Sequence, residues 1–386
     1  MKILVITPLY HIEGREDLVH DTSAVHYLLK YNADINDIVV VNTYMNRKKN
    51  VFKYMNPVRL FRFLNGYRYE IDGIQVHLIE SFMLSDFRFS RIDRLRIKRT
   101  IRNATASWNT EPDLVIVHFP NMAVSYISEI RGKRKVAVLH ASDVNASKRD
   151  RDLTNNLTSC YDACYARSMN IQRHFKAAGV SNLSDVIILS GAPRVEAATG
   201  KAKDRFSQGR IRVLYAGKLI RRKRVDYIIK ALSRIERGKI QLDIVGEGPE
   251  SDKLKDMVLK EKLEDFVIFH GQQSRETVIE MMKSADVFCM PSVEETFGLV
   301  YIEAMACGCV TIGTKGEGID GLIQDGVNGY LVDGLCSLVD ILKRIAYCSD
   351  RMVLMRISHA AVNTASEFTE EKMSRRYLDV LSGKIN

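Results

Sequence analysis

The segment Pro291-Ser292-Val293-Glu294-Glu295-Thr296-Phe297-Gly298-Leu299-Val300-Tyr301-Ile302-Glu303-Ala304-Met305-Ala306 follows an apolar run that ends at Met290. The run predicts a strand. The segment predicts a short loop and then a helix that begins near Thr296 or Phe297, with Gly308 placed to end it. A strand that leads through a short loop into a helix is the repeating unit of α/β folds. The segment therefore predicts an α/β fold.

The same alternation of short β-branched runs and longer amphipathic stretches extends over the whole chain. Most of the runs are apolar nearly throughout, which is typical of parallel strands covered on both faces by helices. The candidate strands form two series, 2–7, 38–42, 74–79, 114–118, 136–140, 163–166 and 186–189, then 212–216, 241–245, 267–270, 287–290, 310–313 and 329–332. We therefore expect two doubly wound, Rossmann-like domains.

The domain boundary is predicted within residues 193–210, which contain Pro, Gly, Ser and several charges but no clear apolar period. We expect an N-terminal domain over 1–193, a linker over 194–210 and a C-terminal domain over 211–365. The remaining residues, 366–386, include an amphipathic stretch with Tyr377 and Leu381 on its apolar side, predicted as a helix that packs back toward the N-terminal domain.

Composition limits the class of protein. With 386 residues, 46% hydrophobic and 27% charged, the chain is typical of a soluble globular protein. The apolar run 3–6 is too short for a signal-peptide core, and no run reaches the roughly 18 apolar residues of a membrane span, so we expect a cytoplasmic protein. Seven irregularly spaced cysteines favour reduced thiols over a zinc site or disulfides. The net charge of +10 suits an anionic partner.

The helix start near Gly298 carries the first candidate site. Backbone N–H groups at Gly298, Leu299 and Val300 would be free there, which suits a diphosphate. Glu295 and Glu303 would lie roughly 12 Å apart at most, about the reach from a sugar ring across a diphosphate to a ribose. The alternative interpretation is an ordinary helix start in which the dipole favours acidic residues.

Two further strand ends carry candidate ligand-binding residues. The first ends at Gly217 and is followed by Lys218, Leu219, Ile220, Arg221, Arg222, Lys223 and Arg224. Cations at this edge of a parallel sheet would neutralise a departing nucleoside diphosphate, although such a run is often only a solvated surface. The second strand ends at Gly246, whose Gly-Glu-Gly-Pro turn allows a tight bend near a ligand. Another strand ends at His270, where a nucleotide base could lie.

Together these motifs resemble the retaining glycosyltransferases of family 4, which have the GT-B fold of two Rossmann-like domains facing across a cleft. The family pattern of a glutamate, seven residues and a second glutamate matches Glu295 and Glu303 around Phe297-Gly298-Leu299-Val300. Its Gly-Arg-Leu loop is matched with Lys218 in place of the arginine. Its lysine is kept as Lys223, and Arg224 stands where a glycine is usual. The resemblance is specific over about 211–332 and looser before that.

The resemblance implies the roles of the site residues. The catalytic set is His140, Lys218, Lys223 and Glu295. The donor would bind to Gly14, Gly217, Gly246, His270, Phe297, Gly298, Leu299, Val300 and Glu303. Two further residues are assigned to the acceptor side from their places in the sequence and not from the resemblance: Arg15, as a positive charge for the cleft, and His118, for which an ordinary strand-end histidine is the alternative. Gly14 is the one glycine in a loop where the family commonly has a Gly-Gly pair, and Ser190-Gly191 stands for the usual Asn-Gly.

The resemblance also implies the reaction, a metal-independent hexosyl transfer with retained configuration. It needs no cofactor beyond the co-substrate, a UDP- or GDP-linked sugar. The acceptor would be a glycan or a lipid-linked glycan in surface polysaccharide synthesis, with no nucleic acid. Alternatives are a nucleotide-sugar epimerase of the same fold and a non-catalytic basic protein that binds lipid or nucleic acid.

A basic, aromatic segment over 82–102 has two interpretations. Its seven basic residues alternate with apolar ones: Arg88, Arg91, Arg94, Arg96, Lys98, Arg99 and Arg102. One interpretation is a helix on an anionic membrane surface, which would place the enzyme peripherally on the inner face of the cell membrane. The other is an ordinary surface helix that packs its apolar face inward.

Overall fold

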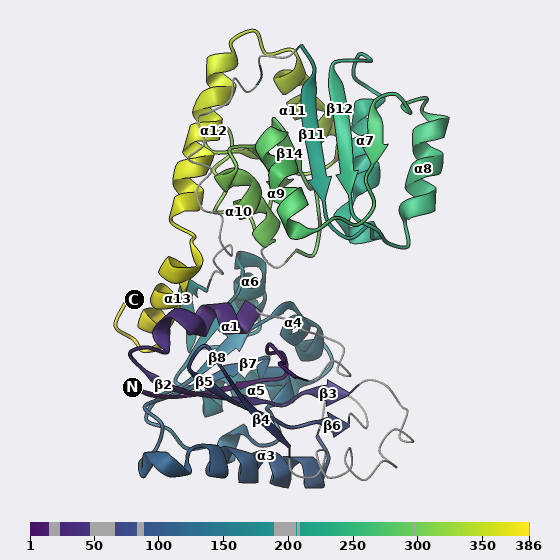
Figure 1. Ribbon diagram of the computed structural model, residues 1–386. Coiled ribbons are helices and arrows are strands. Elements are labelled where there is room, and N and C mark those ends of the chain that lie inside the picture. The colour runs from purple at the N-terminus through teal and green to yellow at the C-terminus, as the bar shows by residue number, and fades with distance from the viewer. Residues whose placement is uncertain are drawn as a thin grey trace. The chain divides into compact units, whose positions relative to one another are not determined.

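The computed structural model describes residues 1–14, 24–46, 66–82, 89–188, 206, 209–295 and 298–385. These residues form two compact units, the first of Met1–Ser190 with Glu371–Asn386 and the second of Gly191–Glu370. Each unit is an α/β domain with its own sheet (Figure 1). Most of the predicted linker over 194–210, together with Ser190-Gly191, lies outside the described residues.

The sheet of the first unit has the strand order β10-β9-β8-β7-β1-β2-β5-β4. Its strands are β1 (Lys2–Thr7), β2 (Asp37–Asn42), β4 (Tyr67–Ile71), β5 (Ile74–Leu78), β7 (Leu114–His118), β8 (Lys135–Leu139), β9 (Ala163–Ala166) and β10 (Leu183–Ile187). All neighbours are parallel except β4, which pairs antiparallel with β5. Two short strands, β3 (Met45–Asn46) and β6 (Ser81–Phe82), pair separately.

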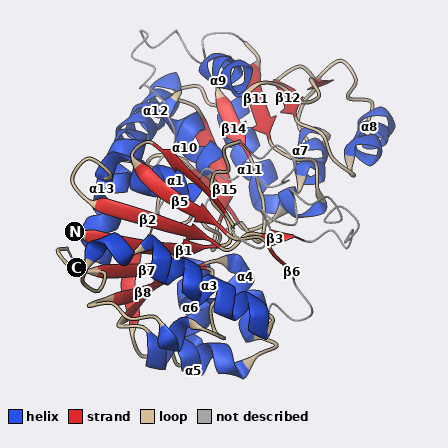
Figure 2. Ribbon diagram, turned by 60° about the horizontal axis from the view of Figure 1, so that its bottom comes forward, coloured by secondary structure: helices blue, strands red, loops and turns tan. Residues whose placement is uncertain are grey.

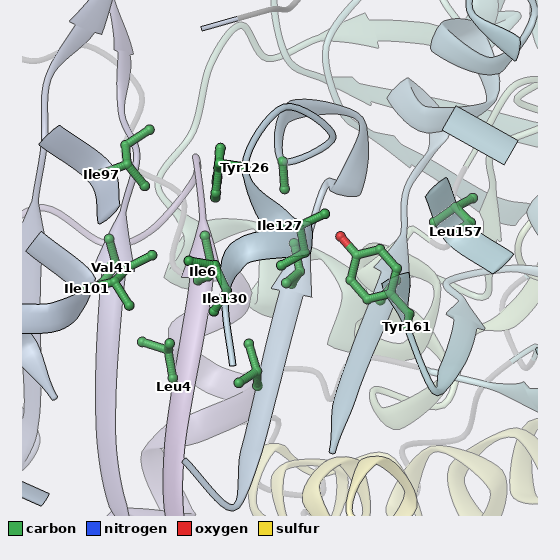
Figure 3. Close-up of a cluster of buried hydrophobic side chains, with 14 of the residues drawn as sticks. Leu4, Ile6, Val41, Ile97, Ile101, Tyr126, Ile127, Ile130, Leu157 and Tyr161 are labelled. Atoms are coloured by element: carbon green, nitrogen blue, oxygen red, sulfur yellow. The ribbon is translucent and has the colours of Figure 1, made fainter. Parts of the chain in front are cut away.

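Helices cover both faces of this sheet because successive strand residues point to opposite sides (Figure 2). Leu4 and Ile6 belong to one buried cluster, drawn in Figure 3, while Ile3 and Val5 belong to the other. Four helices contribute to the first cluster or pack against it: α3 (Arg91–Ala104), α4 (Ala141–Ser147), α5 (Arg151–Cys160) and α6 (Met169–Ala177).

The second cluster is closed by the first and the last helices of the chain. These are α1 (Ala24–Leu29) and α13 (Glu370–Leu381). The apolar side of α13 is fully buried there, with Tyr377 and Leu381 no more than 1% exposed. The buried Asn32 donates to Ser374 Oγ at 2.9 Å, which ties the end of the α1 segment to α13. The C-terminal residues therefore complete the core of the N-terminal domain.

The sheet of the second unit is parallel throughout, in the order β13-β12-β11-β14-β15-β16. Its strands are β11 (Ile211–Ala216), β12 (Ile240–Val245), β13 (Val267–Phe269), β14 (Val287–Cys289), β15 (Val310–Thr314) and β16 (Tyr330–Val332). Its helices are α7 (Val225–Leu232), α8 (Ser251–Lys260), α9 (Arg275–Ser284), α10 (Leu299–Ala306), α11 (Leu335–Ala346) and α12 (Arg351–Ser366). Helix α7 packs against α8 and α11, and α10 packs against α9 and α12.

The predicted α/β class with two doubly wound domains is confirmed. Strand positions agree to within one or two residues except at β10, which begins three residues earlier than expected. The edge hairpin formed by β4 and β5 was only half predicted, because β4 alternates half-buried and exposed residues instead of forming an apolar run.

Candidate functional site

The topology of the second sheet marks where a ligand would bind. Strands β12 and β13 follow on one side of β11, and β14 to β16 follow on the other, so the strand order reverses between β11 and β14. Open α/β sheets bind ligands outside the carboxyl ends of the strands at such a point. A cavity of about 840 Å³ lies there, and six residues assigned to the site from sequence line it: Gly217, Lys218, Lys223, Gly246, Val300 and Glu303.

Glycines let two backbone loops touch at the rim of this cavity. Gly246 has φ +128°, and a Cβ there would lie 2.0 Å from the carbonyl oxygen of Gly217. A Cβ on Gly248 would lie 2.2 Å from the carbonyl oxygen of Leu219. The amide of Leu219 donates to the carbonyl of Glu247 at 2.9 Å and fixes this register. Any side chain at 246 or 248 would therefore push the loops apart. Gly248 was not among the sequence-assigned residues.

The cationic wall of the cavity contains an ion pair. Lys218 is exposed at the rim, whereas Lys223 is largely buried and its Nζ contacts the carboxylate of Glu295. Arg222 Nη1 lies 3.3 Å from the same carboxylate oxygen. Glu295 itself is not among the lining residues. The structure thus pairs Glu295 with Lys223, a contact that the sequence did not predict.

The N-terminus of α10 opens toward the same cavity. The helix begins at Leu299 after Gly298, which has φ +75°. Residues 296–297, and with them the donor-binding candidate Phe297, lie outside the described residues. Below this helix end, Tyr301 is fully buried, and its hydroxyl donates to the carbonyl of Met290 at 2.5 Å. This bond ties the first turn of α10 to the end of β14, which fixes the amides of the first turn in place.

Arg275 is a site residue that the sequence analysis missed. Its Nη2 lies 2.6 Å from Glu303 Oε1, and both residues line the cavity. Burial raises the pKa of Glu303, and Arg275 opposes that shift. An arginine in the first turn of a helix, here α9, is disfavoured by the helix dipole. That unfavourable position was the feature of the sequence that could have marked Arg275 as a site residue.

His270 lies next to the cavity and is held by a carboxylate. It follows β13, and its Nε2 is 2.7 Å from Oδ1 of the buried Asp243. The ring is partly exposed, and the neighbouring residues Gln272 and Gln273 line the cavity. His270 therefore lies at the edge where the sequence analysis placed a base.

In the first unit, the half-buried His140 and the buried His118 form a pair. His140 follows β8 as the N-cap of α4, and its Nε2 lies 3.0 Å from His118 Nδ1. His118 Nε2 lies 2.7 Å from the hydroxyl of Tyr377 on α13. Burial lowers the pKa of His118 to about 3, and burial together with His118 lowers that of His140. Both imidazoles are therefore neutral near pH 7.

His118 does not fit the acceptor role assigned from sequence. Its side chain is only 1% exposed, and both ring nitrogens already have protein partners. It instead holds the ring of His140 through their hydrogen bond, while Phe119 stacks on that ring at a centroid distance of 3.7 Å.

Asp143 completes the setting of His140. Its carboxylate accepts the backbone N–H of His140 at 2.7 Å and that of Asn121 at 3.0 Å. Burial nevertheless raises the pKa of Asp143 to about 7. Two backbone donors from different loops therefore meet on one carboxyl group, which fixes the position of His140 at the strand end.

The loop after β1 places Gly14 beside the β4 edge. Gly14 has φ +69°, and a Cβ there would lie 2.7 Å from the hydroxyl oxygen of Tyr67. The next residue, the acceptor candidate Arg15, lies outside the described residues.

Helix α3 packs part of its apolar side inward, as the interpretation of the basic segment as an ordinary surface helix expects. Ile97 and Ile101 are buried in the core, whereas Ile92 and Leu95 are 71% and 66% exposed. Residues 83–88 of that segment lie outside the described residues. Across the described parts of the chain, no helix is long and apolar enough to span a membrane. The same parts contain no group of three or more His, Cys, Asp or Glu residues that could hold a metal ion.

Comparison with solved structures defines the class of fold. The chain matches Anabaena Alr3699/HepE in complex with UDP over 99% of its own length and 100% of that chain, with a TM-score of 0.68 at 19% identity. It also matches the lipopolysaccharide outer core galactosyltransferase WaaB over the full length of both chains, with a TM-score of 0.71 at 17% identity. The fold is GT-B.

Sequence comparison gives the family. Residues 198–349, which make up most of the C-terminal domain, match the profile of the glycosyl transferases group 1. N-acetyl-alpha-D-glucosaminyl L-malate synthase of Bacillus anthracis is 39% identical over 112 residues, which are 29% of each chain. The chain matches less than a third of the length of such curated relatives. The resemblance to glycosyltransferases drawn from the sequence is therefore confirmed.

Proposed function

We propose that the protein is a retaining glycosyltransferase that transfers a hexosyl group from a UDP- or GDP-linked sugar to a glycan or lipid-linked acceptor. The observation that carries the proposal is the cavity at the switch point of the second sheet. It combines close-packed glycine loops, two lysines, a helix N-terminus and the Arg275–Glu303 pair. The structurally similar Anabaena Alr3699/HepE has been solved in complex with UDP and with UDP-glucose, which supports a nucleotide-sugar donor.

Each group in the cavity has a role in this proposal. The diphosphate lies at the start of α10, where backbone amides and the helix dipole favour negative charge. Lys218 and Lys223 stabilise the charge that develops on the departing diphosphate, so no metal is required. Glu303 accepts hydrogen bonds from the ribose diol through the oxygen that Arg275 leaves free. The base lies near His270.

Glu295 and Lys223 act as a pair. In the free protein the carboxylate holds the lysine beside the α10 terminus. When the donor binds, the sugar hydroxyls donate to Glu295 and the lysine is shared with the diphosphate. Because Glu295 and Lys223 are already oriented before the reaction, no free energy is spent on arranging them during the chemical step, which lowers the barrier to transfer.

The first unit supplies the acceptor side and His140. A neutral imidazole at the end of β8 is suited to accept or donate a hydrogen bond at the sugar or the reacting centre. Surface polysaccharide synthesis, a cytoplasmic location and peripheral membrane contact belong to the same proposal and rest on the family resemblance.

Donor recognition is tested through the ribose. Wild-type protein should bind a nucleoside diphosphate about tenfold or more tightly than its 2′-deoxy analogue, because a lost hydrogen bond leaves a carboxylate unsatisfied. Glu303→Ala should abolish that preference. Glu280→Ala on α9, whose carboxylate is exposed and paired with Lys283, is the matched control and should keep it. An unchanged ribose preference in Glu303→Ala would contradict the assignment.

Transfer itself is tested with a panel of nucleotide sugars. A bound donor should raise the melting temperature by mass action, and added acceptor should then yield product with retained anomeric configuration. Conversion of the donor without any acceptor would instead favour an epimerase. Donor turnover that survives Glu295→Ala would contradict the catalytic role of that residue.

A further inference from the structure

The first unit contains a second concave site, formed between helix α3 and the β4–β5 hairpin. Its volume is about 410 Å³, within the range of small-molecule sites. The lining residues from the helix are Arg96, Arg99, Thr100 and Asn103, which share one face at helical spacing, and those from the hairpin include Arg68 and His77. We call this site the α3–hairpin pocket.

The hairpin side of the pocket is set by strand register. Arg68 on β4 lies directly opposite His77 on β5, so both side chains leave the sheet on the same face. That face is the one covered by α3, because His77 is paired with Val41, which belongs to the core cluster of α3. Leu78 and Ile79, at the carboxyl end of β5, also line the pocket. Its position is thus on the ligand-binding edge of the first sheet.

The charge of the pocket is positive and only partly compensated. Among the described residues, three arginines line it and no acidic residue does. Arg96 is paired with Asp93 at 2.9 Å and donates to the carbonyl of Glu80. Arg68 and Arg99 are exposed, and neither has an ion-pair partner among the described residues. Glu70 is on the same face of β4 but does not line the pocket.

His77 adds a polar atom without a partner. The residue is 7% exposed, and its Nδ1 is buried without a hydrogen bond within the described structure. Burial and the positive charge of Arg68 lower its pKa to about 4. A buried polar group usually has a hydrogen-bond partner, so its absence here points to a ligand.

We propose that the α3–hairpin pocket binds a phosphate group. Guanidinium groups from two walls match the tetrahedral oxygens of a phosphate through paired N–H donors, and Thr100 and Asn103 can supply further hydrogen bonds. The volume leaves room for part of the molecule that carries the phosphate. If the proposed transferase function holds, this phosphate belongs to the acceptor, since the pocket lies in the unit that does not contain the donor cavity.

The test uses the full-length chain with inorganic phosphate and with sn-glycerol 3-phosphate, at constant ionic strength. Hydrogen exchange should slow in peptides covering 66–79 and 96–103. Arg68→Gln and Arg99→Gln should each weaken binding about tenfold, as expected for loss of one charge-assisted contact. Arg102→Gln is the matched control. It removes the same charge from the same helix, but Arg102 lines a different cavity with Glu111 and Glu129. The phosphate affinity of the Arg102→Gln variant should therefore change less than about twofold.

A second arm identifies the source of the phosphate. Vesicles containing phosphatidylglycerol are compared with phosphatidylcholine vesicles, with glycerol 3-phosphate as the competitor. Displacement by the competitor would assign a lipid headgroup, whereas binding of the soluble probe without vesicle binding would assign a soluble phosphate ester. In both arms the proposal requires the Arg99 variant to lose affinity and the Arg102 variant to keep it.

Three results would overturn the proposal: no saturable binding, equal losses in the Arg99 and Arg102 variants, or protection confined to the loop at 217–224. The phosphate arm needs no donor, so its outcome is independent of transferase activity. A chain that transfers sugar but gives no protection at 66–79 would refute the pocket alone.

Discussion

Substitution of Gly246 by alanine tests the close approach of the two donor-site loops. A Cβ at this position would lie 2.0 Å from the Gly217 carbonyl oxygen, whereas real Cβ contacts essentially never fall below 3.0 Å. The loops must therefore separate by about 1 Å. Two backbone bonds between the loops oppose that movement, Gly217 to Val245 at 3.0 Å and Leu219 to Glu247 at 2.9 Å, and a third holds Gly246 to Gly271 on the other side at 2.7 Å.

The size of the effect follows from two contributions. A non-glycine residue at φ +128° costs about 1–3 kcal/mol. Weakening two of the three backbone bonds adds about 1 kcal/mol each. We expect Gly246→Ala to destabilise the second unit by about 3–5 kcal/mol and to reduce nucleoside diphosphate affinity, because Gly217 and Gly246 both line the cavity.

Gly238→Ala separates the steric effect from the backbone effect. Gly238 also has a positive φ, +86°, but the nearest atom to an added Cβ is the flexible end of Arg210 at 3.9 Å. Its cost should be the conformational strain alone, about 1–2 kcal/mol. The gain from restricting the unfolded chain is common to both variants and cancels in the comparison.

The assay is native-state hydrogen exchange at amides of β11 and β12, because a chain of two units does not guarantee a single unfolding transition. It is accompanied by titration with nucleoside diphosphate. If Gly246→Ala and Gly238→Ala differ by less than about 0.5 kcal/mol, the loops do not touch as described, and the structural reason for glycine at 246 is wrong.

Three further predictions concern other positions in the two units. Arg224 has φ +52° at the position where the family usually has glycine, so Arg224→Gly should be about 1 kcal/mol more stable than Arg224→Ala in urea denaturation, and the reverse order would refute left-handed strain there. Tyr377→Phe and Tyr165→Phe each remove a hydroxyl that joins α13 to the sheet of the first unit and should cost similar stability, about 1–3 kcal/mol. Only Tyr377→Phe should also lower kcat, because only Tyr377 contacts the His118–His140 pair; equal losses of kcat would contradict the connection. The pKa of His118 is lowered from 6.5 to about 3, so below pH 6.5 the unfolded chain binds the proton first. Stability should then fall on acidification from pH 6.5 toward 3 by up to about 1.4 kcal/mol per pH unit, and His118→Gln should flatten this slope in pH-dependent urea titrations.

The strands and the donor loops could be predicted from sequence because their signals are local. A parallel strand covered on both faces, such as β7, appears as a continuous apolar run. Gly217 and Gly246 stand directly after such runs, and the ligand edge of the sheet is where those runs end. The strand β4 was not predicted, because an edge strand with alternating exposed residues such as Arg68 and Glu70 resembles a polar loop.

The pairing of charges within the site could not be predicted. Glu295 and Glu303 were placed by their spacing, but their partners come from other elements of the fold: Lys223 is 72 residues away and Arg275 is 28. Periodicity shows which side of an element is buried and contains no information on which distant side chain it meets.

The hydrogen bonds that connect Tyr377 through His118 to His140 could not be predicted from the sequence, because they exist only in the folded chain. His118 and Tyr377 are separated by 259 positions, yet their ring nitrogen and hydroxyl lie 2.7 Å apart. This contact exists because α13, which follows the second unit in the chain, fills the core of the first. If Tyr377 donates to His118 Nε2, then His118 must donate through Nδ1 and His140 must accept at Nε2. If His118 Nε2 instead donates to Tyr377, then His118 accepts at Nδ1 and His140 donates through Nε2. The orientation of the Tyr377 hydroxyl on the last helix is thus coupled to the nitrogen of His140 that carries the proton, although no residue of that helix lies within 200 positions of His140 in the sequence.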